Sequence, residues 1–132
     1  MRLTLKHVAA IILVLGFATP VVAGPLEDAD AAIRRRDYAT ALRLIRPLAE
    51  KGDANAQYNL GVFYDNGLGV PQDKVRAYMW FNLSAAQGRE KVRQLFETLS
   101  HGLTPAQIAE AQKFTREMEN RITAAFFVRQ RE

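Results

Sequence analysis

The sequence contains no cysteine among its 132 residues. A chain without thiols forms no disulfide and offers neither a cysteine nucleophile nor a thiolate metal site. Histidine is nearly as scarce, because His7 and His101 are the only two, and this leaves no ordinary zinc-binding set. We therefore expect no metal and no other cofactor, and we expect side-chain packing alone to hold the fold.

Paired catalytic groups are also missing. His101 directly follows Ser100, and adjacent positions on a helix do not face each other, so the two do not form a base and a nucleophile. We predict that the protein is not an enzyme. The alternative is a small exported hydrolase. It would require an enzymatic activity that is abolished when His101 is substituted.

The chain lacks a strong excess of charge of either sign. It has 18 Lys and Arg against 14 Asp and Glu, and two of the basic residues, Arg2 and Lys6, lie near the start. Residues 24–132 therefore carry 16 − 14 = +2. This charge is too small to predict nucleic-acid binding, and we expect no nucleic-acid partner.

A single apolar run stands out, at residues 8–18. It follows a basic start, is broken at Thr19-Pro20 and leads to Ala23. This order predicts that residues 1–23 are a signal peptide cleaved after Ala23, so that the protein is periplasmic or secreted. A retained anchor is the alternative, but the sixteen residues from 8 to 23 are fewer than the roughly 20 that span a bilayer.

An internal repeat with a period of thirty-six residues follows. Like residues recur at helical spacing in six pairs: Asp37/Asp73, Ala41/Ala77, Leu44/Trp80, Ile45/Phe81, Ala49/Ala85 and Gly52/Gly88. A period near this length is typical of stacked helix pairs. Small Ala residues let helices approach closely, and the larger side chains fill the space between layers.

Capping residues divide the chain into six helices. Aspartates at 37, 53 and 73 precede three of them, and Thr104-Pro105 with Gln107 predicts a capping box for the last. The expected helices cover about 25–36, 37–51, 53–65, 73–87, 90–100 and 105–123. No strand pattern competes. We predict an all-α fold, a short α-solenoid of three antiparallel helix pairs over residues 24–123, and a separate tail at 124–132.

The centre of the chain resembles a known repeat. Ala56-Gln57-Tyr58-Asn59-Leu60-Gly61, then Tyr64, Gly67-Leu68-Gly69-Val70, Asp73, Ala77, Trp80-Phe81, Ala85-Ala86 and Gly88 are similar to a Sel-one-like repeat, a relative of the tetratricopeptide repeat. The match covers 53–88; residues 26–52 resemble a shortened repeat without the glycine turn, and 89–123 a capping helix pair. The resemblance implies a scaffold or adaptor that binds other proteins, often in exported bacterial settings.

The expected binding surface is the inner curve of this stack. In stacked helix pairs the first helix of each pair lines that curve, and its Asn and Arg side chains can bond a peptide backbone or a carboxylate. We predict that a protein or peptide partner binds Asp30, Arg34, Asn55, Asn59, Phe63, Arg93 and Glu97.

The tail at 124–132 suggests an alternative function. Ala124-Ala125-Phe126-Phe127-Val128 precedes Arg129 and Arg131, and aromatic groups beside positive charge suit a membrane surface or an assembly partner. A second interpretation is that Phe126 and Phe127 fold back against the last helix pair. The sequence leaves both interpretations open.

Overall fold

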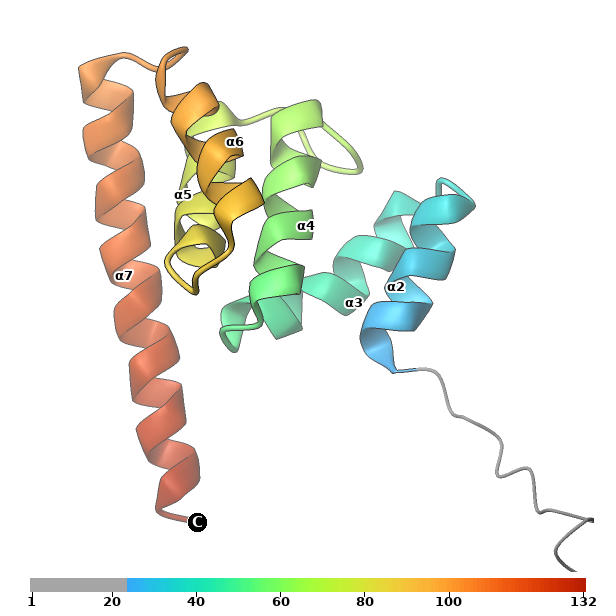
Figure 1. Cartoon of the computed structure of the whole chain (residues 1–132). Coiled ribbons are helices and arrows are strands. Elements are labelled where there is room, and N and C mark those ends of the chain that lie inside the picture. Colours follow the sequence, from blue (N-terminus) through green and yellow to red (C-terminus); the bar gives the residue numbers. More distant parts are fainter. Residues whose placement is uncertain (1–23) are drawn as a thin grey trace, which may run out of the picture.

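A computed structural model describes residues 24–132, and the predicted signal peptide at 1–23 lies outside the described residues. The described chain consists of helices joined by short loops, as Figure 1 shows. The helices are α2 (Pro25–Arg34), α3 (Tyr38–Glu50), α4 (Ala54–Asn66), α5 (Lys74–Ala85), α6 (Glu90–Ser100) and α7 (Pro105–Gln130). The predicted all-α solenoid is therefore confirmed, with most helix bounds within about two residues of the prediction.

The helices begin where the sequence places caps. The side chains of Asp37, Asp53 and Asp73 accept hydrogen bonds from backbone N–H groups three residues further on, at 3.2, 2.8 and 3.0 Å. Such caps satisfy donors that have no partner inside the helix. Before α7, the Gln107 N–H donates to Thr104 Oγ1 at 3.2 Å and the Thr104 N–H donates to Gln107 Oε1 at 2.9 Å. The predicted capping box is confirmed.

The thirty-six-residue period is visible in the core. Ala41 and Ala77 are both fully buried, and Ile45 and Phe81 are buried in the same hydrophobic cluster. The helices α3 and α5 end before glycines at 52 and 88, whose φ angles of 100° and 87° suit glycine. Equivalent positions thus have equivalent surroundings, as a repeated helix pair requires.

Gly61 lies in the middle of α4, where glycine lowers helix stability by roughly 1 kcal/mol relative to alanine. A Cβ atom at this position would lie 2.6 Å from both Cδ1 and Cε1 of Phe81 on α5. The absence of a side chain at 61 therefore allows α4 and α5 to pack closely. This close contact explains why a glycine occupies the middle of α4.

A buried polar cluster joins the first repeat to the second. The Gln57 side chain is buried, and its Nε2 donates to the Ala49 carbonyl at 3.2 Å. Gln87 Nε2 donates to Gln57 Oε1 and to the Gly52 carbonyl, both at 2.9 Å. Because a buried polar group without a partner is costly, these bonds favour one packing arrangement of the two repeats.

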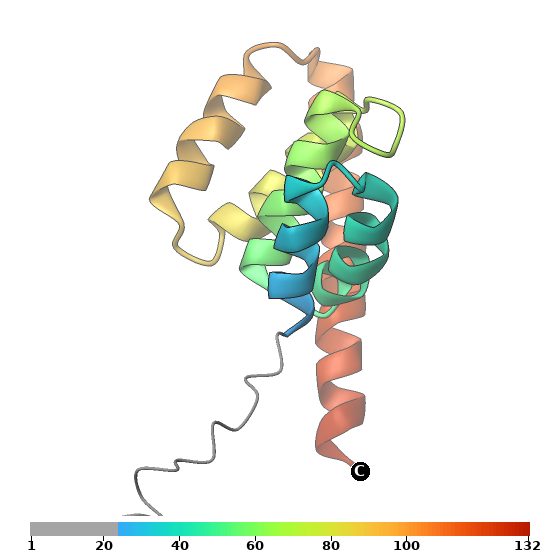
Figure 2. The same ribbon diagram turned by 90° about the vertical axis from the view of Figure 1, so that its right-hand side faces the viewer.

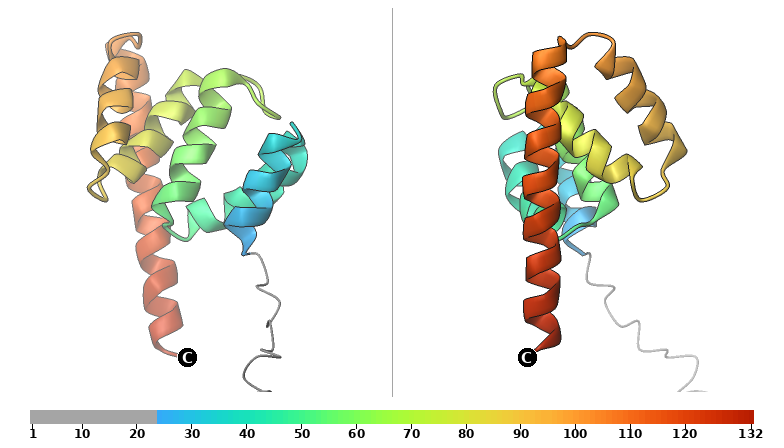
Figure 3. Two further views of the ribbon diagram at one scale, coloured as in Figure 1. Left: turned by 45° about the vertical axis from the view of Figure 1, so that its right-hand side comes forward. Right: turned by 90° about the vertical axis from the view of Figure 1, so that its left-hand side faces the viewer.

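The last two helices differ from the closed pair that the sequence predicts. Both α6 and α7 pack on α5, but they hardly contact each other. Figures 2 and 3 show them as an open V joined by the loop after α6. The apolar residues of α6 explain this, because Val92 is buried in the core and the Phe96 ring lies 4.4 Å from the Tyr78 ring on α5. Little apolar surface of α6 remains for α7.

The predicted tail is helical for most of its length. Helix α7 has 26 residues and continues to Gln130, because no glycine or proline follows Pro105 in the chain to end it. Its last turns reach beyond the other described helices (Figure 1). Phe126 and Phe127 are 57% and 60% exposed, so the hypothesis that they fold back against the last helix pair is wrong. Within the described residues, no helix is both long and apolar enough to cross a membrane.

Candidate functional site

A hollow of about 430 Å³ lies between the first helices of the first two pairs, α2 and α4. The first turns of α4 and of α2 form its walls, and the residue before α6 closes one side. The lining residues are Leu26, Glu27, Asp30, Asn55, Tyr58, Asn59 and Arg89. Polar side chains surround the Leu26 side chain and the Tyr58 ring in this hollow.

A second hollow, of about 730 Å³, continues from the first toward α6. It is lined by Tyr58, Arg89, Glu90, Lys91, Val92, Gln94, Leu95 and Thr98. The two hollows share Tyr58 and Arg89, so they adjoin. Together they form one open groove across α2, α4 and α6, which we call the inner groove. The first helix of each pair, α2, α4 and α6, thus contributes to this groove.

The middle of the inner groove is held in place by the core. The Tyr58 ring packs against the Phe81 ring at 6.0 Å between centroids, and Phe81 is itself buried. Arg89 donates a hydrogen bond from its guanidinium to Asn55 Oδ1, which links the start of α6 to α4. A partner would therefore meet an aromatic ring and a guanidinium that are already oriented.

Charge is distributed unevenly along the inner groove. Its α2 end carries Glu27 and Asp30, Arg89 lies in the middle, where the two hollows meet, and the α6 end carries Lys91. Glu90 also lies at the α6 end, but its carboxylate pairs with the Arg93 guanidinium at 2.7 Å. The groove therefore has an acidic end at α2 and a basic end at α6.

The Glu90–Arg93 pair affects the pKa of both groups. The hydrogen bond from Arg93 lowers the pKa of the Glu90 carboxyl, and the bond to Glu90 raises the pKa of the Arg93 guanidinium. Both side chains are exposed, so the pair is screened by water. Its consequence for the groove is that Glu90 stays ionised and its charge is offset by a neighbouring cation.

Three of the seven predicted binding residues lie in the inner groove: Asp30, Asn55 and Asn59. The structure brings them together from α2 and α4, which are far apart in the sequence. Arg34 is exposed four residues after Asp30 on α2, but it is not among the residues that line the groove.

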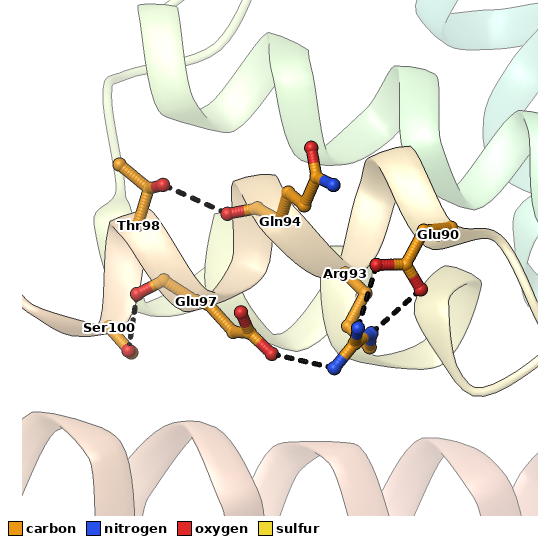
Figure 4. Close-up of polar contacts among 6 residues, drawn as sticks. All are labelled: Glu90, Arg93, Gln94, Glu97, Thr98 and Ser100. Carbon is orange, nitrogen blue, oxygen red and sulfur yellow. Dashed lines mark hydrogen bonds and ion pairs between the residues drawn. The ribbon is translucent and has the colours of Figure 1, made fainter.

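Arg93 and Glu97 lie elsewhere on α6. Arg93 pairs with Glu90 and, at 3.0 Å, with Glu97. Figure 4 shows the Arg93 and Glu97 side chains on the side of α6 toward α7, whereas Gln94 points toward α4. The prediction placed Arg93 and Glu97 on the wrong side of α6, because the helix has a polar stripe on both sides and the sequence does not orient it.

Phe63 is a core residue and not a binding residue. Its side chain is 2% exposed and packs edge-on against the Tyr38 ring at 6.0 Å. The prediction followed the spacing Asn55, Asn59, Phe63. Eight residues on a helix turn through about 80° from the starting direction, and this rotation moves Phe63 from the groove into the contact with α3.

The sequence analysis missed Tyr58 and Arg89, which both hollows share. Tyr58 lies three residues after Asn55 and one before Asn59, so the helical spacing alone could have placed it on the same face. Arg89 precedes α6. Because Gly88 was expected to end the preceding helix, the sequence indicated only that Arg89 lies between two helices. Its place beside Asn55 depends on how α6 folds back over α4.

A smaller cleft of about 300 Å³ lies on another face, between α7 and helices α3 to α5. Its floor includes Trp80 and Tyr64, and Arg76 covers it, with the guanidinium carbon 5.7 Å from the centroid of the Tyr64 ring. This cleft is smaller than either hollow of the inner groove. We therefore take the inner groove as the candidate site.

The residues considered for catalysis lie outside both clefts. Ser100 Oγ donates to the Glu97 carbonyl at 2.6 Å, so its hydroxyl is bonded within its own helix. His101 is exposed directly after α6. Among residues 24–132, no group of three or more His, Asp or Glu side chains could hold a metal ion.

Comparison with known proteins gives one finding that bears on this arrangement. The Sel1-repeat family matches the chain twice, at residues 30–53 and at residues 54–88. The first match spans part of α2 and all of α3, and the second spans α4, the glycine-containing loop and α5. The resemblance seen in the sequence is confirmed. A search of curated proteins found no significant match.

Proposed function

The chain contains two Sel1 repeats, and from this premise we propose that it is an exported, non-catalytic adaptor whose inner groove binds an extended segment of a partner protein. Sel1 repeats are commonly protein-interaction scaffolds. The observation that carries the proposal is the groove itself, an open surface across three helices that ends in opposite charges. Open grooves of this kind suit a polypeptide better than a small substrate, which enzymes usually enclose.

The charges of the inner groove define the chemistry of the partner. Glu27 and Asp30 at the α2 end favour a cationic side chain, and Arg89 in the middle with Lys91 toward α6 favours an anionic one. Between them, the Tyr58 ring offers an apolar contact, and the Asn59 amide can both donate to and accept from a peptide backbone. We therefore expect an extended segment with a basic residue near one end, an apolar residue in the middle and an acidic residue near the other end.

Selection of phage-displayed peptides on immobilised protein tests this proposal. Peptides that bind should share the basic–apolar–acidic order, and the same peptides should bind the Asp30→Lys and Arg89→Glu variants about tenfold more weakly, which corresponds to about 1.4 kcal/mol. Ala39→Lys is the matched control, since Ala39 is exposed on α3 outside the groove. Selected peptides that bind all variants equally would refute the groove as the site.

Export is proposed on the sequence of the first 23 residues. The basic start, the apolar run at 8–18 and Ala23 support cleavage and delivery to the periplasm or the medium. Expression of the full chain in a bacterium, followed by fractionation and determination of the N-terminal residue, checks this. Cleavage predicts Gly24 as the first residue in the soluble exported fraction, whereas a full-length chain in the membrane fraction would indicate a retained anchor.

A further inference from the structure

The end of α7 exposes more apolar surface than any other part of the described chain. Phe126, Phe127 and Val128 are 57%, 60% and 60% exposed, and Leu95 on α6 is the only other large apolar side chain among the exposed residues of 24–132. The rings of Phe126 and Phe127 touch edge-on, with 5.9 Å between their centroids. Exposed aromatic clusters of this kind mark surfaces that bind something.

The apolar residues at this end surround the helix and do not form a stripe. Residues 124–128 are five consecutive small or apolar positions, and at 3.6 residues per turn they cover the whole circumference. A helix that docks on another helix or in a protein groove shows a stripe on one face. Consecutive exposed apolar side chains at the end of a helix, followed directly by Arg129 and Arg131, instead suit shallow insertion at a lipid surface, where the charged groups stay among the head groups.

The charge of this end also suits a bilayer surface. Residues 120–132 carry three basic side chains, Arg121, Arg129 and Arg131, against the single acidic Glu132. This excess of positive charge attracts anionic phospholipid head groups.

The orientation of the molecule is consistent with a membrane on this side. Helix α2 begins on the side of the molecule toward which α7 ends, and α7 extends past all the other described helices on that side (Figures 1 to 3). The end of α7 can therefore reach a flat surface before any other described helix does.

We propose that the end of α7 docks on the surface of anionic phospholipid bilayers. Phe126 and Phe127 enter the boundary between head groups and acyl chains, and Arg129 and Arg131 bind lipid phosphates. The inner groove is formed by α2, α4 and α6, so lipid binding at the end of α7 leaves it open. This proposal does not depend on the partner of the groove, and the two can fail separately.

Co-sedimentation with lipid vesicles tests the proposal. Residues 24–132 contain every core side chain described above and are used because they lack the apolar run at 8–18, which would itself bind lipid. The protein is mixed with vesicles of phosphatidylcholine alone or of phosphatidylcholine with phosphatidylglycerol. We expect binding to the anionic vesicles that is at least about tenfold stronger than to the neutral ones, and that weakens as salt is added.

Three variants identify the surface. The double variant Phe126→Ser/Phe127→Ser should lose binding to both kinds of vesicle, and Arg129→Gln/Arg131→Gln should lose only the preference for anionic lipid. Ala109→Ser is the control on the same helix, because Ala109 is exposed near the start of α7, far from this end and outside the inner groove, and it should bind as the wild type does. Circular dichroism confirms that each variant is folded.

Two results would overturn the proposal. The first is equal sedimentation of the wild type and the double phenylalanine variant, or no sedimentation of either with anionic vesicles. The second is a dimer of residues 24–132 in analytical ultracentrifugation that is lost in the phenylalanine variant, together with no vesicle binding. That outcome would assign the end of α7 to a second copy of the chain.

Discussion

The contact between Gly61 and Phe81 predicts an unusual response to a small substitution. In an exposed helix, Gly→Ala increases stability by roughly 1 kcal/mol. At position 61 the added Cβ would lie 2.6 Å from two atoms of the Phe81 ring, and excess volume in a packed core costs about 1–3 kcal/mol. The cost exceeds the gain, so we expect Gly61→Ala to lower the free energy of unfolding by about 1 kcal/mol.

A double-mutant cycle separates the two contributions. Phe81→Val removes the ring atoms nearest to position 61, so in that background Gly61→Ala should become neutral or stabilising, with a coupling of about 2 kcal/mol. Urea unfolding followed by the fluorescence of Trp80, the only tryptophan, measures each free energy. Gly102→Ala is the control, because a Cβ there would meet only the Leu99 carbonyl oxygen at 3.5 Å. The reasoning would be refuted if Gly61→Ala raised the free energy of unfolding of the wild-type protein and the cycle showed no coupling between positions 61 and 81.

Substitutions at three further positions test the fold. Trp80→Ala should lower the free energy of unfolding by roughly 3–5 kcal/mol, because it empties a buried site between layers; a nearly unchanged thermal midpoint would contradict this. Asp53→Ala should cost about 1 kcal/mol by removing the cap of α4, and Asp53→Asn should cost less in the same thermal assay. The hydrogen bond from Thr40 lowers the pKa of Asp37, so the charged carboxylate stabilises the fold above its unfolded pKa of about 3.9. The stability gap between wild type and Asp37→Asn should therefore shrink as the pH falls from about 5 to about 3 in urea titrations, and a constant gap would argue against the cap.

Local signals in the sequence were sufficient for most of the fold. Asp37 and Asp73 cap α3 and α5, and the glycines at 52 and 88 have positive φ angles. Each of these residues acts within a few positions of the chain, so its type and spacing predict its structural role. The same holds for Gly61, because a mid-helix glycine is best explained by a close neighbour.

The site was harder to predict because it depends on how helices are rotated against one another. Asn55 and Asn59 lie in the inner groove, but Phe63, at the next step of the same spacing, faces α3. On α6, the residues that face the groove and those that face α7 are both polar. Only the packing of α6 on α5 determines which of these two polar sides faces the groove. No short-range pattern contains that information.

The end of α7 shows a second limit of local reasoning. Ala124 to Val128 contain no helix breaker, and the structure continues the helix through them to Gln130. The sequence suggested either a surface-binding tail or a segment folded against the core. The exposed Phe126 and Phe127 exclude the folded-back alternative, because α7 is longer than the body on which it packs.

Photo-crosslinking in cells tests the central claim, that the inner groove binds a partner protein, most directly. A photoreactive amino acid is placed at position 59, in the groove, or at position 39, which is exposed on α3 outside it. Irradiation of cells that export the chain should give a discrete crosslinked product from position 59 and none from position 39. Products of equal intensity from both positions, or a product from position 39 alone, would contradict the account.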